Sequence, residues 1–302
     1  MSAPWLREAR EFWTDPVRGS SAALFRIGYG VLAIWTALGV LLNLQRYYGN
    51  RGMLPWSAVQ HFPEQRYSLF SLAPTSDLLL HATGAAFLLA AVTLTLGIAP
   101  RASALVIFVI NIALQHRNPY VVNNGDRLFV ILAALGACLP LGQRWSVAAF
   151  RKRGGNRPPS RPLVWSQRLI QLQIAYVYLF SCFAKVRHPR WLSGEAVYDV
   201  LKSPVFSEWP VKLEFAPLVR VLTWSTLLFE LLFPILVWDR RYRRYLLAAG
   251  VFFHLGIELT LTIPMFSAIM VVSYACFLSD DETEALVGWL KARVWAPLAQ
   301  RR

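Results

Sequence analysis

Charged and polar side chains interrupt several long apolar runs of this sequence, and these interruptions are the first candidates for chemistry. Glu230 lies in the middle of one run, His254 and Glu258 lie four residues apart in another, and Lys185 closes a third. A charged group at the centre of a bilayer costs about 2.5–3.5 kcal/mol even on the gentler scales, so such residues are rare and usually functional. We therefore expect these four residues to mark a site.

A second polar group falls in a short connection between two apolar runs. It consists of His116, Arg117, Asn123, Asn124 and Asp126. In the topology derived below, this connection and Lys185 lie on the same side of the membrane, which predicts a polar cavity open to the outside with Lys185 near its rim. The alternative is a capped turn, because Asn, Gly and Asp are typical turn residues and Asp126 is suited to N-cap the following helix.

Each intramembrane residue also has an explanation without chemistry. Lys185 can extend its amine to the membrane interface, and Glu230 can pair with a neighbouring Arg or Lys. His254 and Glu258 share one helical face, where a hydrogen-bonded pair would hold helices together. One His and one Glu at this spacing make a poor zinc site, because zinc usually has three or four protein ligands, so we predict no metal.

The composition indicates a membrane protein. Of the 302 residues 56% are hydrophobic and only 16% are charged, whereas soluble domains carry about 25% charged residues. The formal net charge is +14, which in a soluble protein would suggest nucleic-acid binding. Here the charges form short blocks between apolar runs, so they indicate membrane orientation instead, and we expect the lipid bilayer and no nucleic acid as a partner.

The apolar runs predict about eight transmembrane helices, since a crossing needs roughly 17–25 mostly apolar residues. We therefore expect an all-α polytopic membrane helix bundle forming a single domain over residues 1–302. Amphipathic segments before the first span and after the last predict interfacial helices, although packing on the bundle would explain them equally well. The expected spans are 22–42, 78–98, 102–115, 128–141, 169–184, 221–238, 245–261 and 265–278.

Lys and Arg residues in the connections predict the orientation. The connection between the fourth and fifth spans carries seven basic residues and no acid, Arg144, Arg151, Lys152, Arg153, Arg157, Arg161 and Arg168. A second basic block runs from Asp239 to Arg244, and Arg101 lies between spans two and three. With eight spans all three connections fall on one face, which the positive-inside rule makes cytoplasmic. The sequence thus predicts a multi-pass protein of the cytoplasmic membrane with both termini in the cytoplasm.

Five blocks of this sequence resemble, in their order along the chain, the HTTM domain (horizontally transferred transmembrane domain) of vitamin K-dependent γ-glutamyl carboxylases and their bacterial relatives. The opening block is ALFRIGYG followed by YYGNRGMLPWS. Four further blocks agree in order, namely HRNPYVVNNGDRLF, LPLGQRWSV, YVYLFSCFAKVRHPRWLSGEAVYDVL and FFHLGIELTLTIPMFSAIMVVSYACFLS. The resemblance covers nearly the whole chain.

The resemblance implies a specific chemistry. In the carboxylases a lysine at the end of the matching helix is the base toward reduced vitamin K, which with O2 gives a strong base that deprotonates a peptide glutamate, and the carbanion adds CO2. Lys185 in FAKVRHPRW matches that lysine. The reaction needs an unprotonated amine, which apolar walls favour. The sequence departs from the animal enzymes in two ways, because Gly125 follows the Asn pair where those enzymes have His, and the large luminal region that binds the propeptide is missing.

Three functions are compatible with these observations. The first is an enzyme that uses reduced vitamin K or a related quinone, O2 and CO2 to modify a peptide or small substrate on the outer face. The second is a non-enzymatic membrane partner that binds or presents a secreted peptide or a partner subunit, and a transporter is the third. For the enzyme, catalysis would fall to Lys185, Asn123 and Asn124. Binding would fall to His116, Arg117, Asp126, Trp191, Glu230, His254 and Glu258.

Overall fold

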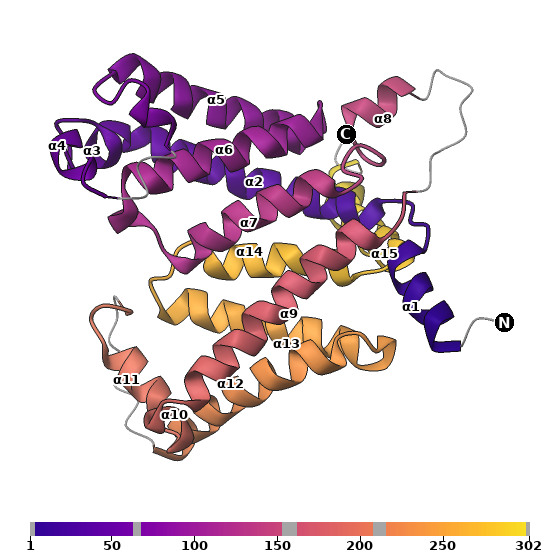
Figure 1. Ribbon diagram of the computed structural model, residues 1–302. Helices are drawn as coiled ribbons and strands as arrows, with labels where there is room; N and C mark the ends of the chain where they lie inside the picture. Colours follow the sequence, from indigo (N-terminus) through magenta and orange to yellow (C-terminus); the bar gives the residue numbers. More distant parts are fainter. Residues whose placement is uncertain (1–3, 63–67, 153–161, 208–215, 300–302) are drawn as a thin grey trace. The chain divides into compact units, whose positions relative to one another are not determined.

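Each of the eight apolar runs contains a helix in the computed structural model, which describes residues 4–62, 68–152, 162–207 and 216–299. The regular elements of this described part are helices, apart from a single β-bridge between Pro16 and Leu163. The chain divides into two units (Figure 1). Unit 1 comprises Met1–Arg168 and Leu278–Arg302, and unit 2 comprises Leu169–Phe277.

Four helices form the centre of unit 1. They are α2 (Ser20–Leu42), α5 (Asp77–Leu96), α6 (Pro100–Arg117) and α7 (Asn124–Cys138). α2 packs on α5, α5 on α6 and α6 on α7, so neighbours in sequence lie side by side (Figure 1). The contact between α2 and α5 is close at Gly30, where a Cβ atom would lie 2.3 Å from the Thr95 hydroxyl oxygen. A larger residue at position 30 would therefore force these helices apart.

Short elements and one further long helix, α15, complete unit 1. They are α1 (Pro4–Thr14), α3 (Leu44–Tyr48), α4 (Trp56–Val59), η2 (Leu69–Ser71), η3 (Pro119–Val121), α8 (Val147–Lys152) and α15 (Asp280–Ala299). α1 leaves Trp5 and Trp13 exposed, as an amphipathic helix at a lipid interface would. The interfacial position of α1 and α15 stays a prediction.

The first residue of α15 caps the first long helix. One Asp280 carboxylate oxygen accepts hydrogen bonds from the backbone N–H groups of Ser20 (2.6 Å) and Ser21 (3.3 Å), and the other accepts from the Arg18 N–H (2.6 Å). Glu284, one turn further along α15, accepts from the Ser20 hydroxyl at 2.6 Å. Helix N-termini leave backbone donors without partners, and here a distant segment of the chain supplies the acceptors.

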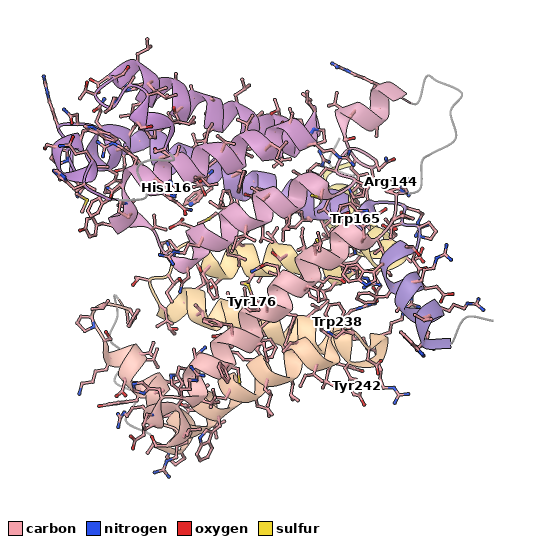
Figure 2. All side chains as sticks on the ribbon, in the orientation of Figure 1. His116, Arg144, Trp165, Tyr176, Trp238 and Tyr242 are labelled. Carbon is pink, nitrogen blue, oxygen red and sulfur yellow. The ribbon has the colours of Figure 1, made fainter. Side chains whose placement is uncertain are left out.

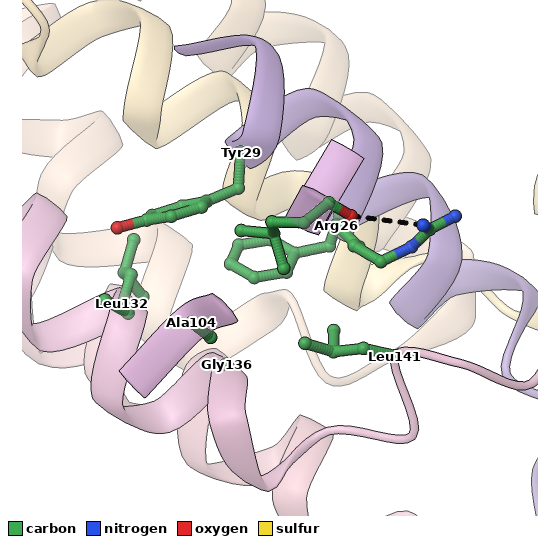
Figure 3. Close-up of a pocket in the computed structure, with 9 residues that line it drawn as sticks. Arg26, Tyr29, Ala104, Leu132, Gly136 and Leu141 are labelled. Atoms are coloured by element: carbon green, nitrogen blue, oxygen red, sulfur yellow. Dashed lines mark hydrogen bonds between the residues drawn. The ribbon is translucent and has the colours of Figure 1, made fainter. Parts of the chain in front are cut away.

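The Arg26 side chain holds the C-terminal end of α5 in place. This side chain is 1% exposed, and its guanidinium donates to the carbonyls of Leu94 (3.2 Å), Thr95 (3.0 Å) and Trp145 (2.6 Å). Two of these carbonyls belong to the last turn of α5, where a cation is favourable. Beside Arg26 lies a cavity of about 10 Å³ that also borders Tyr29 (Figure 3). Such a volume holds about one water molecule.

Unit 2 is built around four longer segments. They are α9 (Trp165–Val186, whose first four residues belong to unit 1), α12 (Ala216–Leu236), α13 (Arg240–Thr260) and α14 (Phe266–Ser273) with η4 (Tyr274–Phe277). The short helices α10 (Pro189–Leu192) and α11 (Ala196–Lys202) follow α9. α12 packs on α13 and α13 on α14, while α10 and α11 both contact α12.

The helices confirm the predicted all-helical fold and indicate a membrane protein, but they do not give the number of crossings. By length and composition, four of the described helices can cross a membrane: Ser20–Leu42, Asp77–Leu96, Trp165–Val186 and Ala216–Leu236. The predicted count of eight crossings stays a prediction. A proline separates the last two predicted spans as expected, since α13 ends at Thr260 and α14 begins at Phe266, on either side of Pro264.

One connection is shorter than predicted. The basic block that was expected to link the sixth and seventh spans is instead the first turn of α13, which begins at Arg240. The Asp239 carboxylate caps that turn by accepting from the Arg241 N–H at 2.8 Å, and arginine is a good helix former. Of the other basic connection, Arg153, Arg157 and Arg161 lie outside the described residues.

Candidate functional site

A lysine, a serine and a glutamate meet inside unit 2. α9 carries Ser181 and Lys185 one turn apart, and α12 carries Glu230 opposite them. The Lys185 Nζ donates to Glu230 Oε1 at 2.5 Å and to Ser181 Oγ at 2.6 Å, while Ser181 Oγ donates to the same Glu230 oxygen at 3.0 Å. We call these three residues together with Trp191 the Lys185 site.

Burial is unequal across this ion pair. The Lys185 side chain is 22% exposed, whereas the Glu230 side chain is 4% exposed. Glu230 Oε2 is buried and has no hydrogen-bond partner within the described part of the chain. Buried carboxylate oxygens are normally hydrogen-bonded, so an unpartnered one calls for an explanation. The accessible end of the Lys185 site is thus the Lys185 amine. Behind it, the buried Glu230 Oε2 can still accept a hydrogen bond.

Trp191 lies over Lys185 from the short helix α10, which follows α9. Its ring centroid lies 5.0 Å from Lys185 Nζ, within the range of a cation–π contact. Arg190, also in α10, ties this helix to α11, because it bonds both carboxylate oxygens of Asp199 at 2.6 Å and also pairs with Glu195. The Arg190 guanidinium holds the pKa of the Asp199 carboxyl below its usual range. These bonds hold α10, and with it Trp191, in a defined place.

A second polar cluster lies one turn before Ser181 on α9. The Tyr178 hydroxyl bonds His254 Nε2 of α13 at 2.8 Å and also the hydroxyl of Tyr274 in η4. All three side chains are buried, and His254 Nδ1 has no partner within the described residues. We call these residues the Tyr178 trio. The rings around the trio belong to Phe229, Phe233, Phe253 and Phe266.

Within unit 2 the structure brings together three of the predicted site residues, Lys185, Trp191 and Glu230. The pairing of Glu230 with a lysine, which the sequence left open, is confirmed. The suggested pair of His254 and Glu258 is wrong. His254 is 0% exposed and bonds Tyr178, whereas Glu258 lies exposed on another part of the α13 surface. Tertiary contacts with α9 thus decide the role of His254.

In unit 1 the Asn–Asn–Gly–Asp segment forms the capped turn that the sequence offered as an alternative. Asn123, rather than Asp126, is the N-cap of α7, and its side chain accepts from the N–H groups of Gly125 (2.6 Å) and Asp126 (3.3 Å). Asp126 accepts in return from the Asn123 N–H at 2.8 Å, which closes a capping box. Burial raises the pKa of Asp126, and this hydrogen bond partly offsets the rise. Asn124 is exposed.

Arg117 and His116 end α6 in different environments. Arg117 is 1% exposed and donates to the carbonyls of Leu54 (2.9 Å) and Gly49 (3.4 Å), and burial lowers its pKa. It thereby ties the loop after α3 to α6, which makes it a clamp within unit 1. His116, labelled in Figure 2, is half-buried, and its Nδ1 is buried without a partner among the residues described.

Sequence reasoning missed four of these residues. Ser181, Tyr178 and Tyr274 lie in apolar runs, where hydroxyl-bearing side chains are ordinary, so the sequence carries no signal for them. Arg26 does carry one, because an arginine inside the apolar run 20–42 is costly unless it is paired.

Comparison with known proteins places these residues in a family context. The family model described as "HTTM domain" matches residues 14–281. A Bacillus subtilis (strain 168) protein, the uncharacterized protein YitO, is 23% identical over 88% of this chain and 90% of its own length. The sporulation-delaying protein SdpB of the same organism is 25% identical over 42% of each chain. No solved structure matches.

Proposed function

The chain belongs to the HTTM domain family, and we propose that it is a membrane-embedded enzyme of the vitamin K-dependent carboxylase type with Lys185 as its base. The observation that carries the proposal is the direct contact of the Lys185 amine with the buried Glu230 carboxylate and the Ser181 hydroxyl. This family is related in general to vitamin K-dependent carboxylases. The lysine of the matching block is thus available for proton transfer.

The Lys185–Glu230 pair supplies a base without changing its net charge. As an ion pair, Lys185 is an ammonium ion and cannot accept a proton. Transfer of one proton from Lys185 Nζ to Glu230 Oε1 over 2.5 Å yields a neutral amine and a neutral carboxyl. In a desolvated site the neutral pair is favoured over separated charges. Lys185 then accepts a proton from a substrate hydroxyl, while Ser181 Oγ holds the amine in place.

The surroundings of Lys185 suit a reduced quinone. The ring of Trp191 offers a flat apolar surface next to the amine, and the unpartnered Glu230 Oε2 retains hydrogen-bonding capacity at the buried side of the site. With O2, a bound reduced quinone supplies the strong base that removes the γ-proton of a glutamate, after which CO2 adds to the carbanion. Lys185, Trp191 and Glu230 would hold the quinone head.

The substrate side of the proposal follows from the topology. Lys185 lies in the last turn of α9, which the positive-inside rule directs to the outer face of the cytoplasmic membrane. The proposed substrate is therefore a secreted peptide or a small molecule that reaches the protein from outside. Asn123 and Asp126, used by the capping box, have a smaller part in this proposal than the sequence assigned to them.

The experiment compares purified wild-type protein with Lys185→Ala, each supplied with vitamin K hydroquinone, O2 and a glutamate-containing peptide. Mass spectrometry follows the quinone epoxide. We expect epoxide from wild type and none from Lys185→Ala. Lys202→Ala is the matched control, since Lys202 is an exposed lysine at the end of α11, and it should keep full activity. Because Lys185→Ala leaves Glu230 without its cation, Lys185→Ala/Glu230→Gln is included as a second inactive but folded variant. Equal turnover by all four proteins would contradict the proposal.

A second function, a non-enzymatic partner for a secreted peptide, is favoured by one observation. Lys185 already bonds Glu230 and Ser181, as in a pair that only stabilises helix packing. Absence of epoxide from folded wild-type protein, together with co-purification of a defined secreted peptide that survives Lys185→Ala/Glu230→Gln, would favour this function.

A further inference from the structure

A pocket of unit 1 opens beside α3 and the loop that follows it. Its volume is about 520 Å³, and its lining consists of Gln45, Arg46, Arg51, Gly52 and Met53. Ligand pockets commonly measure about 300–1,000 Å³. Three of the lining residues belong to the block YYGNRGMLPWS, to which the proposed function assigns no role. We call this site the α3 pocket.

The two arginines of the α3 pocket carry charge that no carboxylate balances in an ion pair. Arg46 and Arg51 are exposed, and neither pairs with an acid in the part of the chain that the structure describes. The Arg46 guanidinium lies over the Tyr47 ring, 5.6 Å from its centroid, and stacking of this kind leaves the N–H donors available. Asp77 touches the pocket lining only through the amide of Gln45, which donates to it at 3.2 Å. The pocket therefore presents two sets of charged donors.

Buried polar side chains hold the loop of the pocket from behind. Arg117, which is 1% exposed, donates to two carbonyls of this loop. Asn118, which is 0% exposed, donates from Nδ2 to the Tyr47 carbonyl at 2.7 Å. The Met53 N–H donates to the Arg46 carbonyl at 2.7 Å and so closes the loop onto α3. A surface ordered in this way loses little conformational entropy when a ligand binds.

Gly52 allows a close contact between the loop and α3. A Cβ atom at position 52 would lie 2.2 Å from the Gln45 carbonyl oxygen and 2.5 Å from the Arg46 carbonyl oxygen. Both oxygens belong to the backbone, so a larger residue would push the loop away from α3. Because Arg51 is next to Gly52, this contact keeps Arg51 beside the same pocket as Arg46.

We propose that the α3 pocket binds an acidic segment of a peptide, with Arg46 and Arg51 each holding a carboxylate. Guanidinium groups bind carboxylates through two parallel N–H···O bonds. Met53 is 63% exposed, and its flexible thioether side chain offers an apolar surface that adapts to the rest of the segment. The pocket is larger than a single inorganic anion requires, which favours a ligand with several groups. The identity of the occupant rests on the proposed function, whose substrate is a glutamate-containing peptide.

The expected topology places the pocket where such a peptide arrives. α3 begins at Leu44, directly after α2 ends at Leu42, and α2 is the first predicted span, which leads from the cytoplasm to the outer face. Figure 1 shows α3 and α4 together at one end of the unit 1 helices. A phosphatidylglycerol head group would be the competing occupant on that face. It carries one phosphate charge for two guanidinium groups, so charge balance favours a segment with two carboxylates.

Fluorescence anisotropy of a dye-labelled alanine–glutamate repeat peptide tests the proposal on full-length protein in micelles of a neutral detergent. We expect Arg46→Gln and Arg51→Gln to raise the Kd about tenfold each and the double variant about 100-fold, as loss of one or two charged hydrogen-bonding groups predicts. The same peptide with glutamine in place of glutamate should bind no better to wild type than to the double variant. An unchanged Kd of the glutamate peptide in the double variant would overturn the proposal.

Arg10→Gln/Arg127→Gln is the matched control, because it removes the same charge from two other exposed arginines of unit 1. It should bind the glutamate peptide as wild type does. An equal loss of affinity in this control would show that net charge alone attracts the peptide, which contradicts a specific pocket. Phosphatidylglycerol and inorganic phosphate are added as competitors. Displacement of the peptide from wild type by either one, at a concentration equal to that of the peptide, would assign the arginines to a phosphate and overturn the peptide site.

The proposed enzyme and the α3 pocket can fail separately, since binding is measured without quinone. Lys185→Ala should keep the affinity of wild type for the glutamate peptide. Binding that depends on Arg46 and Arg51, with no epoxide from wild type, would contradict the enzyme and leave the pocket. Epoxide formation whose KM for the peptide is the same in wild type and in Arg46→Gln/Arg51→Gln would overturn the pocket and leave the enzyme.

Discussion

Buried polar side chains have different partners in the two units. In unit 1, Arg26 and Arg117 donate to main-chain carbonyls, three for Arg26 and two for Arg117. In unit 2, Lys185 and Tyr178 bond side chains that can themselves gain or lose a proton, Glu230 and His254. A carbonyl holds a guanidinium in place but does not titrate.

This difference distinguishes buried charges that only stabilise the fold from buried charges that can take part in proton transfer. The arginines of unit 1 join segments that are distant in sequence, such as the end of α5 and the loop at Trp145. The groups of unit 2 join helices too, but their partners are side chains that can titrate. Unpartnered buried atoms do not distinguish the units, since they occur at Arg26 Nε and His116 Nδ1 as well as at Glu230 Oε2 and His254 Nδ1 in the described chain. A buried charge is thus better interpreted from the chemical nature of its partner than from its burial alone.

The largest expected effect concerns the ion pair of unit 2. Lys185→Met should lower the free energy of unfolding by about 3 kcal/mol, because it leaves a buried carboxylate without its cation. The double variant Lys185→Met/Glu230→Leu should regain most of this loss, since removing both members of a buried pair is nearly neutral. Thermal or chaotrope unfolding in detergent measures both. A double variant as unstable as the single one would mean that Lys185 contributes by packing and not by charge.

In unit 1, the stability lost on replacing Arg26 should not be restored by another basic residue. Arg26→Gln should cost about 2 kcal/mol, because the carbonyls of α5 and Trp145 lose charged donors. Arg26→Lys should rescue little, since one ammonium cannot reproduce a planar fork that reaches three carbonyls. The same unfolding assay applies. Full rescue by lysine would show that charge alone is what this position requires, and would remove the contrast with unit 2.

A smaller effect, on pH dependence, is expected where α15 meets α2. Hydrogen bonds from Ser20 and Arg144 hold the pKa of Glu284 below its usual value. A carboxyl with a lowered pKa in the folded state stabilises the fold above its unfolded pKa of about 4.3 and loses this contribution as the pH falls through the folded pKa. The Glu284–Arg144 pair is partly exposed, so it contributes at most about 1 kcal/mol to the free energy of unfolding. Melting temperatures between pH 6 and 3 should fall more steeply for wild type than for Glu284→Gln, and parallel curves would argue against a contribution from this carboxyl.

The smallest effect is expected at the brace beside Trp191. Arg190 and Asp199 are exposed, and exposed ion pairs contribute little to stability. Asp199→Asn should leave the melting temperature unchanged within error but should loosen the attachment of α10, which carries Trp191, to α11, and this should raise the rate of limited proteolysis after Arg190. Asp239→Asn serves as a control at an exposed cap far along the chain. An unchanged cleavage rate would mean that Glu195 alone holds Arg190.

The sequence predicted the positions of the helices because an apolar segment that enters a membrane must satisfy its backbone groups internally, which a helix does. It offered pairing with an Arg or Lys as one explanation of Glu230, because an isolated carboxylate inside a membrane is costly. It did not identify Tyr178 and Tyr274, whose role depends on contacts between α9, α13 and η4, separated by 76 and 96 residues. It also placed His254 beside Glu258, because spacing along one helix says nothing about the helix that packs against it.

The cap on α2 has a consequence for the order of biosynthesis. Ser20 and Ser21 are made before their hydrogen-bond partner, because the carboxylate that accepts their N–H groups belongs to Asp280, 260 residues later than Ser20. At roughly 5–20 residues per second, translation needs on the order of tens of seconds to reach it. Throughout that interval the N–H groups in the first turn of α2 are exposed to water or lipid head groups. The cap on α2 therefore forms only after residues 21–279 have been made.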